Sequence, residues 1–528
     1  MRNHDVLILG GGLAGLTLAL QLKSRRPELD VAVVERLALP YPVAAHKVGE
    51  STVEIGAHYF SETLGLREHL DDDQLLKFGL RFFFGGSRRG TDLAAYDEVG
   101  PSELLPVKTW QLDRGIFENH LAARARRLGV ALLDGARVGR VDISSSGADH
   151  RATVRTPAGE HTLATRWLVD ASGRRALLRR QLGLDKPITH QNSAIWLRLD
   201  VELDIDNWSE SSAWRSRCAE TRRLSTNHLM GPGYWVWLIP LASGATSVGL
   251  VFDPRLVALD EVNTYERFLT WLDVNEPLVS AALREHPDAL MDFRFLRGYP
   301  HNATRVFDPG QWALTGEAGV FADPFYSPGS DFIAIGNTFI TELIAATPPA
   351  QMPQRAAYYQ QIYFSFFSNT LSLFTDQYPG FGDRDLMYLK TVWDYAIYWA
   401  VFAKLFFANR MTDVDFMRSA EPWLVESLRL NRDMQRRFAS VAARRRSLPA
   451  EGRFFDHCAA PWFYQLKEQL VADDQPLLSR LEDNAAKLAL LADRLQRLLA
   501  ASLDGKRLPE PLTIDGLEVS PALERLTA

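Results

Sequence analysis

Cysteine is almost absent from this sequence, which has only Cys218 and Cys458 among its 528 residues. Two cysteines in a chain of this length cannot build a disulfide framework, and they are too few for a cysteine-based metal site. The sequence therefore indicates neither a disulfide scaffold nor a metal centre.

The chain also lacks a strong excess of charge of either sign. Its formal net charge is −6, with 23% charged and 46% hydrophobic residues, and it has no low-complexity tract. A composition this balanced does not indicate nucleic acid as a partner. The length instead allows two or three domains, each with a substantial core.

Long apolar runs are missing as well. The most membrane-like stretch is TVWDYAIYWAVFAKLFFANR, but Asp394 and Lys404 interrupt it before about 18 apolar residues accumulate. We expect a buried helix there and no stable membrane insertion. The first residues, MRNHDVLILGGG, enter a strand at once and leave no room for an export signal, so we expect a cytoplasmic protein.

What the sequence does contain begins with a nucleotide-binding pattern. The stretch DVLILGGGLAGLTLALQL passes from an apolar strand through three spaced glycines into helical spacing, and a second strand, VAVVER, follows. In this setting Gly10 permits a tight turn, Gly12 lets a pyrophosphate approach, and Gly15 lets the helix pack on the strand. The helix N-terminus then faces the phosphates, and Glu35 accepts the ribose hydroxyls. The cofactor-binding candidates here are Gly10, Gly12, Leu13, Ala14, Gly15, Glu35 and Arg36.

Three distant segments extend this pattern. WLVDASGRRALLRRQLG reads as strand, glycine turn and basic helix, WALTGEAGVFADP repeats the strand-to-glycine pattern, and TWQLDRGIFENHLAARA opens an amphipathic helix. Together they resemble the FAD-dependent monooxygenase superfamily, which implies FAD rather than NAD. The resemblance adds Arg114, Asp170, Gly316 and Glu317 to the cofactor-binding candidates. Glu317 stands where the family usually has an aspartate. The glutamate keeps the negative charge, but its extra methylene group changes the position of the carboxylate.

The stretch GYWVWLIPL is predicted to be a strand. Its period of two places Trp235, Trp237 and Ile239 on one face, and Pro240 ends the ladder. These residues either fill a core or wall off the space above a flavin ring.

At this point the resemblance becomes specific to flavin-dependent halogenases. WVWLIP resembles their W-x-W-x-I-P signature, and FADPFYSPG fits their F-x-x-P-x-x-S-x-G signature through Phe321, Pro324, Ser327 and Gly329. HKVGEST resembles the strap that lies between the flavin and substrate sites in that family. The resemblance therefore adds Lys47, Gly49, Ser51, Phe321 and Pro324 to the cofactor-binding candidates, and it makes Trp235, Trp237, Ile239 and Pro240 candidates for the wall of a tunnel.

Halogenases of this type carry an essential lysine further along the chain from the Gly-Glu pair of the strap. Lys77 lies 27 residues after Glu50, at the head of an aromatic strand, FGLRFFFGG. We predict Lys77 as the catalytic lysine and Glu50 as a general base, although Glu50 could equally cap a helix. Lys47 is the rival lysine, and its alternative role is to hold the strap.

The resemblance implies a two-site reaction. Reduced FAD, supplied by a separate NAD(P)H-flavin reductase, and oxygen convert chloride or bromide to hypohalous acid, which travels through a tunnel to the lysine. The halogen is then transferred to an electron-rich aromatic compound of phenol, pyrrole or indole type, free or bound to an acyl carrier protein. The predicted function is thus an FADH2-dependent halogenase.

The halide is expected beside the turn FYSPGS. Backbone N–H groups there can converge on an anion, so Ser327, Gly329 and Ser330 are the halide candidates. Pro328 has no N–H and weakens this expectation. Tyr326 stands where tryptophan halogenases have a glutamate, which argues against free tryptophan as the substrate. The alternative function is an NAD(P)H-dependent FAD aromatic hydroxylase, because Pro328, Gly329 and Asn337 resemble the monooxygenase pattern.

We predict an α/β fold. A Rossmann-type FAD-binding domain with an interleaved antiparallel β-sheet substrate domain is expected over 1–345, and an α-helical region that covers the substrate over 346–528. The aromatic side chains Tyr358, Tyr359, Phe366 and Phe367 belong to a core or line the acceptor pocket. The basic run MQRRFASVAARRRSLP is a solvated face or a docking patch for an acidic carrier protein.

Overall fold

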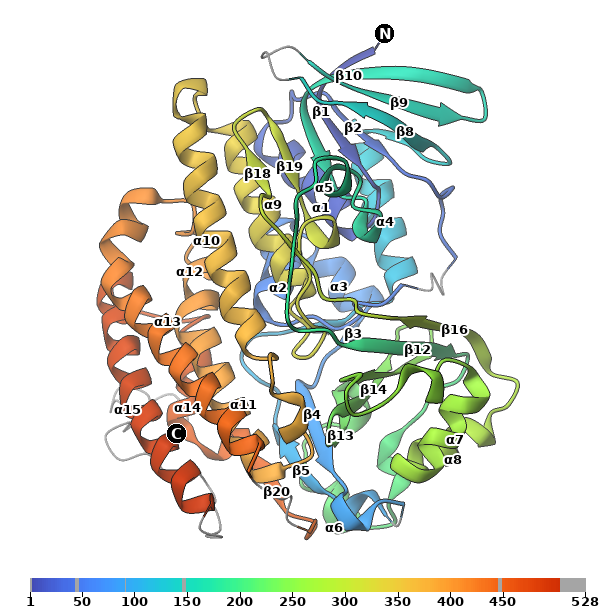
Figure 1. Cartoon of the computed structure of the whole chain (residues 1–528), viewed down its shortest axis with the longest axis vertical. Helices are drawn as coiled ribbons and strands as arrows, with labels where there is room; N and C mark the ends of the chain where they lie inside the picture. Colours follow the sequence, from blue (N-terminus) through green and yellow to red (C-terminus); the bar gives the residue numbers. More distant parts are fainter. Residues whose placement is uncertain (1, 43–46, 91, 145–148, 445–448, 504–528) are drawn as a thin grey trace. The chain divides into compact units, whose positions relative to one another are not determined.

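In the computed structural model, residues 2–42, 47–90, 92–144, 149–444 and 449–503 are described. The chain folds into two compact units, and each is assembled from three separate segments of the sequence (Figure 1). The first unit contains Met1–Gln74, Leu112–Thr189 and Pro300–Ser368, and the second contains Leu75–Gln111, His190–Tyr299 and Asn369–Ala528. The C-terminal helices cluster with the second β-sheet, and the division of the chain at residue 345 stays a prediction.

The first unit is built on a mainly parallel sheet with the strand order β18-β19-β10-β1-β2-β7. The strands are β1 (Arg2–Leu9), β2 (Val31–Val34), β7 (Ala131–Leu133), β10 (Gly159–Asp170), β18 (Phe307–Asp308) and β19 (Trp312–Leu314), with β8 (Arg137–Asp142) and β9 (His150–Thr156) added antiparallel beyond β10. The apolar residues 6–9 and 31–34 are buried, as continuous apolar runs in parallel strands are. The Rossmann-type part of the prediction is therefore confirmed.

Helices cover this sheet, and α1 packs against both α4 and α9 (Figure 1). The helices of the unit are α1 (Leu13–Arg25), α2 (Glu54–His58), the π-helix η1 (Tyr59–Thr63), α3 (Arg67–Asp73), α4 (Arg114–Arg127), α5 (Leu177–Gln181), α9 (Gly329–Ala345) and most of α10 (Met352–Ser372). A short ribbon pairs β11 (Asp185–Lys186) with β17 (Asn302–Ala303). Buried aromatic rings fix α10 on α9, since Phe366 lies 4.8 Å from Phe332 and Tyr359 stacks 4.8 Å from Phe339.

The carboxyl ends of three neighbouring strands coincide in the first unit. Leu9 of β1 is in register with Asp170 of β10, which is in register with Leu314 of β19. The turns after these strands therefore meet at one edge of the sheet, where nucleotides bind in open α/β folds.

The second unit is built on a mixed sheet with the strand order β16-β12-β15-β14-β13-β4-β5-β20. Its strands are β4 (Leu80–Phe84), β5 (Asp97–Gly100), β12 (Ser193–Leu199), β13 (Thr226–Gly231), β14 (Tyr234–Pro240), β15 (Thr246–Phe252), β16 (Leu290–Leu296) and β20 (Phe454–Asp456), and β3 (Leu75–Leu76) pairs with β6 (Trp110–Gln111) separately. Most neighbours are antiparallel, whereas β13 runs parallel to β4 and β20 parallel to β5. The short helix α6 (Ser212–Arg215) also belongs to this unit.

One face of this second sheet forms a hydrophobic core. Phe83, Leu197, Val236 and Leu250 are among its fully buried members, and they pack with α7 (Tyr265–Asn275) and α8 (Pro277–Glu285). Because side chains alternate along a strand, the residues between these positions face the opposite side. That opposite side is rich in aromatic residues.

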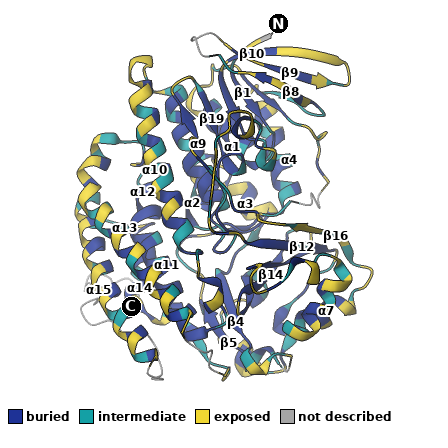
Figure 2. Cartoon of the chain, in the orientation of Figure 1, coloured by how far each residue is buried: buried dark blue, intermediate teal, exposed yellow. Residues whose placement is uncertain are grey.

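The C-terminal helices contain α11 (Arg384–Ile397), the π-helix η11 (Tyr398–Ala403), α12 (Lys404–Phe407), α13 (Val414–Ala442), α14 (Pro461–Glu468) and α15 (Leu477–Leu503). The stretch 391–410 is helical and mostly buried, as the interrupting charges predicted. Along α15 buried and exposed residues alternate at helical spacing (Figure 2). Within the described ranges, none of the helices carries an apolar stretch long enough to span a bilayer.

Candidate functional site

The first glycine turn of the first unit leaves room for a phosphate group. Gly10 has φ +118°, and a Cβ there would lie 2.3 Å from the carbonyl oxygen of Ala171. A Cβ at Gly15 would lie 2.0 Å from the carbonyl oxygen of Gly10, so both positions require glycine. A Cβ at Gly12, in contrast, would meet nothing within 4 Å. This open space adjoins the N-terminus of α1, where an anion is stabilised by N–H groups and the helix dipole.

Glu35 is fixed beside this turn. Its carboxylate accepts from the N–H of Gly11 at 2.8 Å through Oε2 and from the N–H of Leu37 at 2.8 Å through Oε1. Each carboxylate oxygen retains capacity for a second hydrogen bond, as a ribose hydroxyl requires. Gly11 was not among the candidates, although a Cβ there would lie 2.8 Å from that of Glu35. The run of three consecutive glycines, Gly10 to Gly12, is the sequence feature that could have identified Gly11 as a member of this turn.

Asp170 shapes the second turn. Its buried carboxylate accepts from the N–H of Ser172 at 2.9 Å and from that of Leu178 at 2.8 Å. Burial raises the pKa of Asp170, and the hydrogen bonds from Ser172 and Leu178 oppose that rise. Asp170 therefore holds the turn between β10 and α5 in shape.

The third turn carries Gly316 and Glu317. Gly316 has φ +58°, and a Cβ there would lie 3.0 Å from that of Ala14. The carboxylate of Glu317 forms an ion pair with Arg174 at 2.9 Å, which joins the third turn to the second. Nε2 of His301 donates to the carbonyl of Glu317 at 2.9 Å. The three turns thus meet at one edge, as predicted for an FAD site.

The strap is anchored by ion pairs. Arg114 donates from Nη1 to the carbonyl of Val48 at 2.7 Å, and its guanidinium also pairs with Glu118. Lys47 pairs with Glu118 as well, and its ammonium lies 3.8 Å from the centroid of the Tyr41 ring. These contacts tie the strap to α4, which carries Arg114 and Glu118.

The other strap candidates are mostly buried. Glu50 is 2% exposed, and its carbonyl accepts from the N–H of Leu112 at 2.5 Å. Ser51 is buried too, whereas Gly49, with φ +90°, and Arg36 are exposed.

The candidate halide segment leads into α9. Tyr326 and Ser327 both have left-handed backbone, with φ of +65° and +59°, and Pro328 is the N-cap residue of α9. The N–H of Ser327 donates to the carbonyl of Pro324 at 2.9 Å. The next N–H groups are those of Gly329 and Ser330 in the first turn of α9. The N–H groups of a first helical turn have no carbonyl acceptor within the helix.

Helix α2 packs on this first turn of α9. The N–H of Gly56 donates to Asp331 Oδ1 at 2.8 Å, and a Cβ at Gly56 would lie 2.2 Å from the hydroxyl of Ser330. That hydroxyl is buried and has no hydrogen-bond partner among the residues that the structure describes. Asn337, in the middle of α9, donates to the carbonyl of Ala14 at 3.0 Å and so connects α9 to α1.

In the second unit, the predicted strand GYWVWLIPL forms β14 and ends at Pro240. The rings of Trp235 and Trp237 lie 5.6 Å apart on one face, as their spacing predicted. A Cβ at Gly249 would lie 2.2 Å from the indole of Trp237, so this ring lies across the neighbouring strand β15. Ile239 and Pro240 are buried at the end of β14.

Lys77 is 4% exposed and lies between β3 and β4 of the second unit, where its N–H donates to the carbonyl of Thr109 at 2.8 Å. His228 lies on β13, which pairs with β4. Burial lowers the pKa of His228 to about 3, and the charge of Lys77 contributes to this lowering. Nδ1 of His228 donates to the carbonyl of Arg81 at 3.0 Å, and the imidazole stacks on Phe82 at 4.8 Å. No sequence pattern marks His228, which is a lone histidine in the strand TNHLMG.

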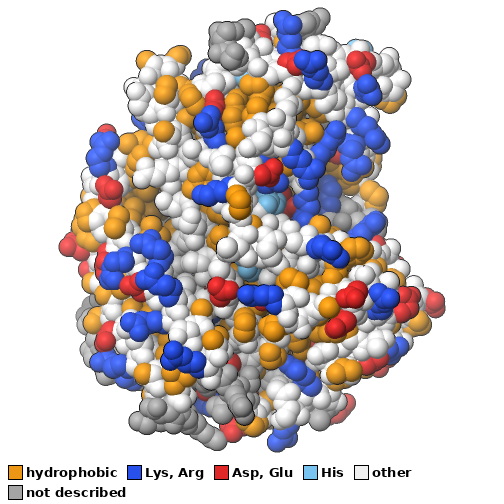
Figure 3. Space-filling view, in the orientation of Figure 1, with side chains coloured by type: hydrophobic (Ala, Val, Ile, Leu, Met, Phe, Trp, Pro, Cys, Tyr) orange, Lys and Arg blue, Asp and Glu red, His pale blue; other side chains and the backbone are white. Residues whose placement is uncertain are grey.

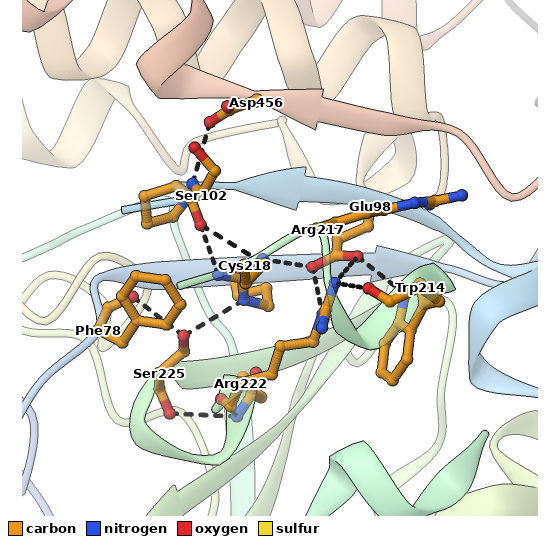
Figure 4. Close-up of polar contacts among 12 residues, drawn as sticks. Phe78, Glu98, Ser102, Trp214, Arg217, Cys218, Arg222, Ser225 and Asp456 are labelled. Atoms are coloured by element: carbon orange, nitrogen blue, oxygen red, sulfur yellow. Dashed lines mark hydrogen bonds and ion pairs between the residues drawn. The ribbon is translucent and has the colours of Figure 1, made fainter. Parts of the chain in front are cut away.

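A buried ionic network supports this part of β4 (Figure 4). Arg81 and Arg222 both pair with Glu98, and the indole of Trp214 donates to the same carboxylate at 3.0 Å. Arg81 also donates to the hydroxyl of Ser225 at 3.3 Å, and that hydroxyl donates to the carbonyl of Phe78 at 3.0 Å. The network therefore fixes the backbone that follows Lys77.

Comparisons with known proteins agree with this geometry. The protein family described as FAD binding domain matches residues 3–237. The flavin-dependent halogenase chlA of Dictyostelium discoideum is 28% identical over 372 residues, which cover 65% of this chain and 60% of that protein. A chlorinase of 1H-pyrrole-2-carbonyl peptidyl-carrier protein from Pseudomonas fluorescens is 26% identical over 348 residues, covering 62% of this chain and 72% of that protein.

The chain is similar to flavin-dependent halogenases. Its fold is theirs too: the crystal structure of the halogenase PltM in complex with phloroglucinol and FAD superimposes with a TM-score of 0.62 at 16% identity, over 94% of this chain and 96% of that one. FAD is the cofactor of this chain. The open space at Gly12 and the three converging turns fit FAD. The match spans less than two thirds of the Dictyostelium protein.

Proposed function

We propose that this chain is a flavin-dependent halogenase that transfers chlorine or bromine to an electron-rich aromatic compound through Lys77. The observation that carries this proposal is the burial of Lys77, directly before the aromatic strand β4, in a chain similar to flavin-dependent halogenases. A lysine on a solvated surface would have no such surroundings.

The flavin side of the reaction belongs to the first unit. Reduced FAD, when bound at the three turns, supplies with oxygen the oxidising power that turns halide into hypohalous acid. The residues proposed to hold the halide are Ser327, Gly329 and Ser330. The support for them is the buried hydroxyl of Ser330 and the N–H groups in the first turn of α9.

The halogen transfer belongs to the second unit. The ammonium of Lys77 donates a hydrogen bond to the oxygen of hypohalous acid, which polarises the oxygen–halogen bond. As the aromatic carbon takes the halogen, Lys77 gives its proton to the departing hydroxide, and water forms. Glu50, predicted from the sequence as the general base, lies in the first unit, and its role stays a prediction.

Trp235 and Trp237 are proposed to keep the aromatic substrate away from the flavin. Their indoles are held in place by hydrogen bonds, since Nε1 of Trp237 donates to the hydroxyl of Ser247 at 3.2 Å. A hydroxylase needs its substrate at the flavin, whereas an enzyme that releases a small oxidant does not. In this proposal the substrate reacts away from the flavin, and direct hydroxylation with NAD(P)H is the alternative.

The proposed partners are a separate NAD(P)H-flavin reductase and a small aromatic substrate, free or bound to a carrier protein. The Pseudomonas relative is named for a carrier-bound pyrrole, which supports the second possibility. The basic run at 434–449 lies partly outside the described residues. Within the described part Arg436 pairs with Asp433, and basic and acidic side chains are interspersed over the face in Figure 3. We propose that the enzyme works in the cytoplasm, where reduced nicotinamide is available to the reductase.

The test is aerobic turnover of the FAD-loaded protein with a flavin reductase, NADH, and chloride or bromide, on a panel of phenols, pyrroles and indoles. Mass spectrometry is expected to show halogenated products. Hydroxylated products alone, or NAD(P)H oxidation without an added reductase, would overturn the proposal in favour of a hydroxylase.

A further inference from the structure

Strand β16 lies at one edge of the sheet in the second unit. It pairs with β12 on one side, and among the described residues no strand lies beyond it. β16 has seven residues, whereas β20, the strand at the other edge, has three. A long edge strand presents a row of backbone N–H and C=O groups with which the strand of another chain can pair.

This edge strand also exposes apolar side chains. Phe295 is 52% exposed and Met291 is 38% exposed. Phe293, which lies between them, is half-buried against the hydrophobic core of the unit, and its ring centroid lies 6.2 Å from that of Tyr265. Large apolar side chains at the open edge of a sheet indicate an interaction surface.

We propose that β16 pairs with β16 of a second copy of this chain, antiparallel and across a twofold axis. The two eight-stranded sheets then form one continuous sheet. Such a pairing uses the same edge in both copies, so it stops at two copies and does not extend into a fibre. One residue of the strand faces its own copy, and the identity of that residue fixes every other pair.

The sequence of the strand matches the register that is centred on Phe293. In this register Arg294 lies opposite Asp292 of the second copy. The exposed Phe295 lies opposite Met291, at which the register of β16 against β12 shifts. Moving the centre by one residue in either direction would place Asp292 or Arg294 opposite its own copy, and like charges directly opposite each other are destabilising. The strand is therefore complementary to itself in charge and in polarity.

The same register continues rows of side chains that exist within one unit. Asp292 lies opposite Arg198 of β12, and its Oδ2 is 3.8 Å from Nε of Arg294. A carboxylate accepts from more than one arginine, so Arg294 of the second copy approaches Asp292 from the outer side of the strand. Phe293 lies opposite the fully buried Leu197, so the hydrophobic cores of the two copies meet at the twofold axis.

The oligomeric state of the FAD-loaded protein tests this inference. Sedimentation velocity over about a hundredfold range of protein concentration is expected to show a reversible dimer. Arg294→Asp places a carboxylate opposite Asp292, and Phe295→Asp places a charge in the apolar contact. Because the twofold axis doubles each change, each variant should raise the dissociation constant about tenfold or more. Leu256→Asp is the matched control, since Leu256 is 53% exposed in the same unit but lies outside β16.

Cysteine cross-linking tests the register. The cysteine of Phe293→Cys lies opposite its own copy, so mild oxidation should give a covalent dimer. The cysteine of Phe295→Cys is four residues away from its copy along the strand, about 14 Å, which is too far for a disulfide. This variant should stay unlinked. The unmodified protein, with Cys218 and Cys458, is the blank.

A protein that stays monomeric at every concentration would overturn the inference, as would a dimer that either β16 substitution leaves unchanged. No covalent dimer of Phe293→Cys, or an equal amount from Phe295→Cys, would overturn the register. A monomer whose β16 amides are protected from hydrogen exchange by an added flavin reductase or carrier protein would assign this edge to that partner instead of a second copy. None of these measurements depends on halogenation, so they stand apart from the test of the proposed function.

Discussion

Nε1 of Trp235 donates to the hydroxyl of Tyr378 at 3.0 Å. This bond joins β14 to the segment before α11, where Tyr378 stacks on Phe381 at 4.4 Å. One indole of the W-x-W pair is therefore held by a residue more than a hundred positions later in the chain.

Removing the hydroxyl tests whether this bond keeps substrate from the flavin. Tyr378→Phe leaves the buried indole N–H without its acceptor, and we expect about 1–3 kcal/mol of lost stability and more hydroxylated by-product per flavin oxidised. Ser247→Ala is the matched variant for Trp237, whose indole bond is broken in the same way. Denaturant unfolding and product mass spectrometry measure both effects. By-product at the level of the unmodified protein in both variants would remove the shielding role.

Lys77→Met is expected to abolish aromatic halogenation while hypohalous acid still escapes into solution, where monochlorodimedone detects it. Burial makes the methionine a tolerated replacement, because a buried charge carries a large desolvation cost. Lys47→Met should instead weaken FAD binding, since it breaks the pair with Glu118. Aromatic product from Lys77→Met would move the catalytic role elsewhere.

Pro328→Ala restores one N–H to the proposed halide segment. Because a hydrogen bond to a charged group contributes roughly 1.5–3 kcal/mol, the KM for halide should fall about tenfold or more. Ser330→Ala removes the buried hydroxyl and should raise that KM. Steady-state rates against chloride and bromide concentration measure both. A halide dependence that neither substitution alters would place the halide elsewhere.

Gly12→Ala and Gly10→Ala separate ligand binding from folding. The Cβ of Gly12→Ala enters the open space, so we expect at least a tenfold weaker FAD complex and a free energy of unfolding of the FAD-free protein changed by no more than about 0.5 kcal/mol. The Cβ of Gly10→Ala collides with the carbonyl of Ala171, so this variant should lose several times more stability. Flavin fluorescence and urea unfolding report the two quantities. Normal FAD affinity in Gly12→Ala would contradict the phosphate position.

Glu276 gives the second unit a pH-dependent stability. It is fully buried, its carboxylate accepts from the hydroxyl of Tyr234 at 2.8 Å, and burial raises the pKa of Glu276 from 4.5 to about 7. Between these values the folded state binds a proton that the unfolded state has lost, so stability falls as the pH rises from 4.5 through 7. The loss is roughly 3 kcal/mol.

Glu276→Gln stays neutral at every pH and should remove this slope, so that thermal unfolding midpoints between pH 5 and 8 become flatter than those of the unmodified protein. Glu426→Gln is the control, because Glu426 is half-exposed on α13 and pairs with Arg429 of its own helix. Equal slopes in all three proteins would show that Glu276 does not titrate in this range.

The nucleotide part of the fold could be predicted because its signals are local. The glycine spacing, the buried strand runs and Glu35 all lie within the first 36 residues. The strand β14 and the helix at 391–410 were likewise recognisable from periodicity and charge spacing.

The surroundings of Lys77 could not be predicted in the same way. Arg81 and Ser225 interact across 144 positions of sequence, and His228 meets Phe82 only because β13 runs parallel to β4. Glu98 forms ion pairs with Arg81 and Arg222, which do not belong to one short sequence motif. Such contacts depend on strand pairing, which the sequence pattern of a single strand does not specify.

The interleaving of the two units has a consequence for synthesis. The chain passes from one unit to the other five times along its sequence. Strand β1 pairs with β10, which ends at Asp170, and β10 pairs with β19, which ends at Leu314. The sheet therefore forms only after residue 314 has been synthesised. At 5–20 residues per second, about 15–60 seconds separate the emergence of the first strand from that of the last. During this time an apolar strand edge lacks its neighbours, which favours chaperone binding. A fragment that stops at residue 237, where the FAD-binding match ends, would lack β19 and α9 and should not retain FAD.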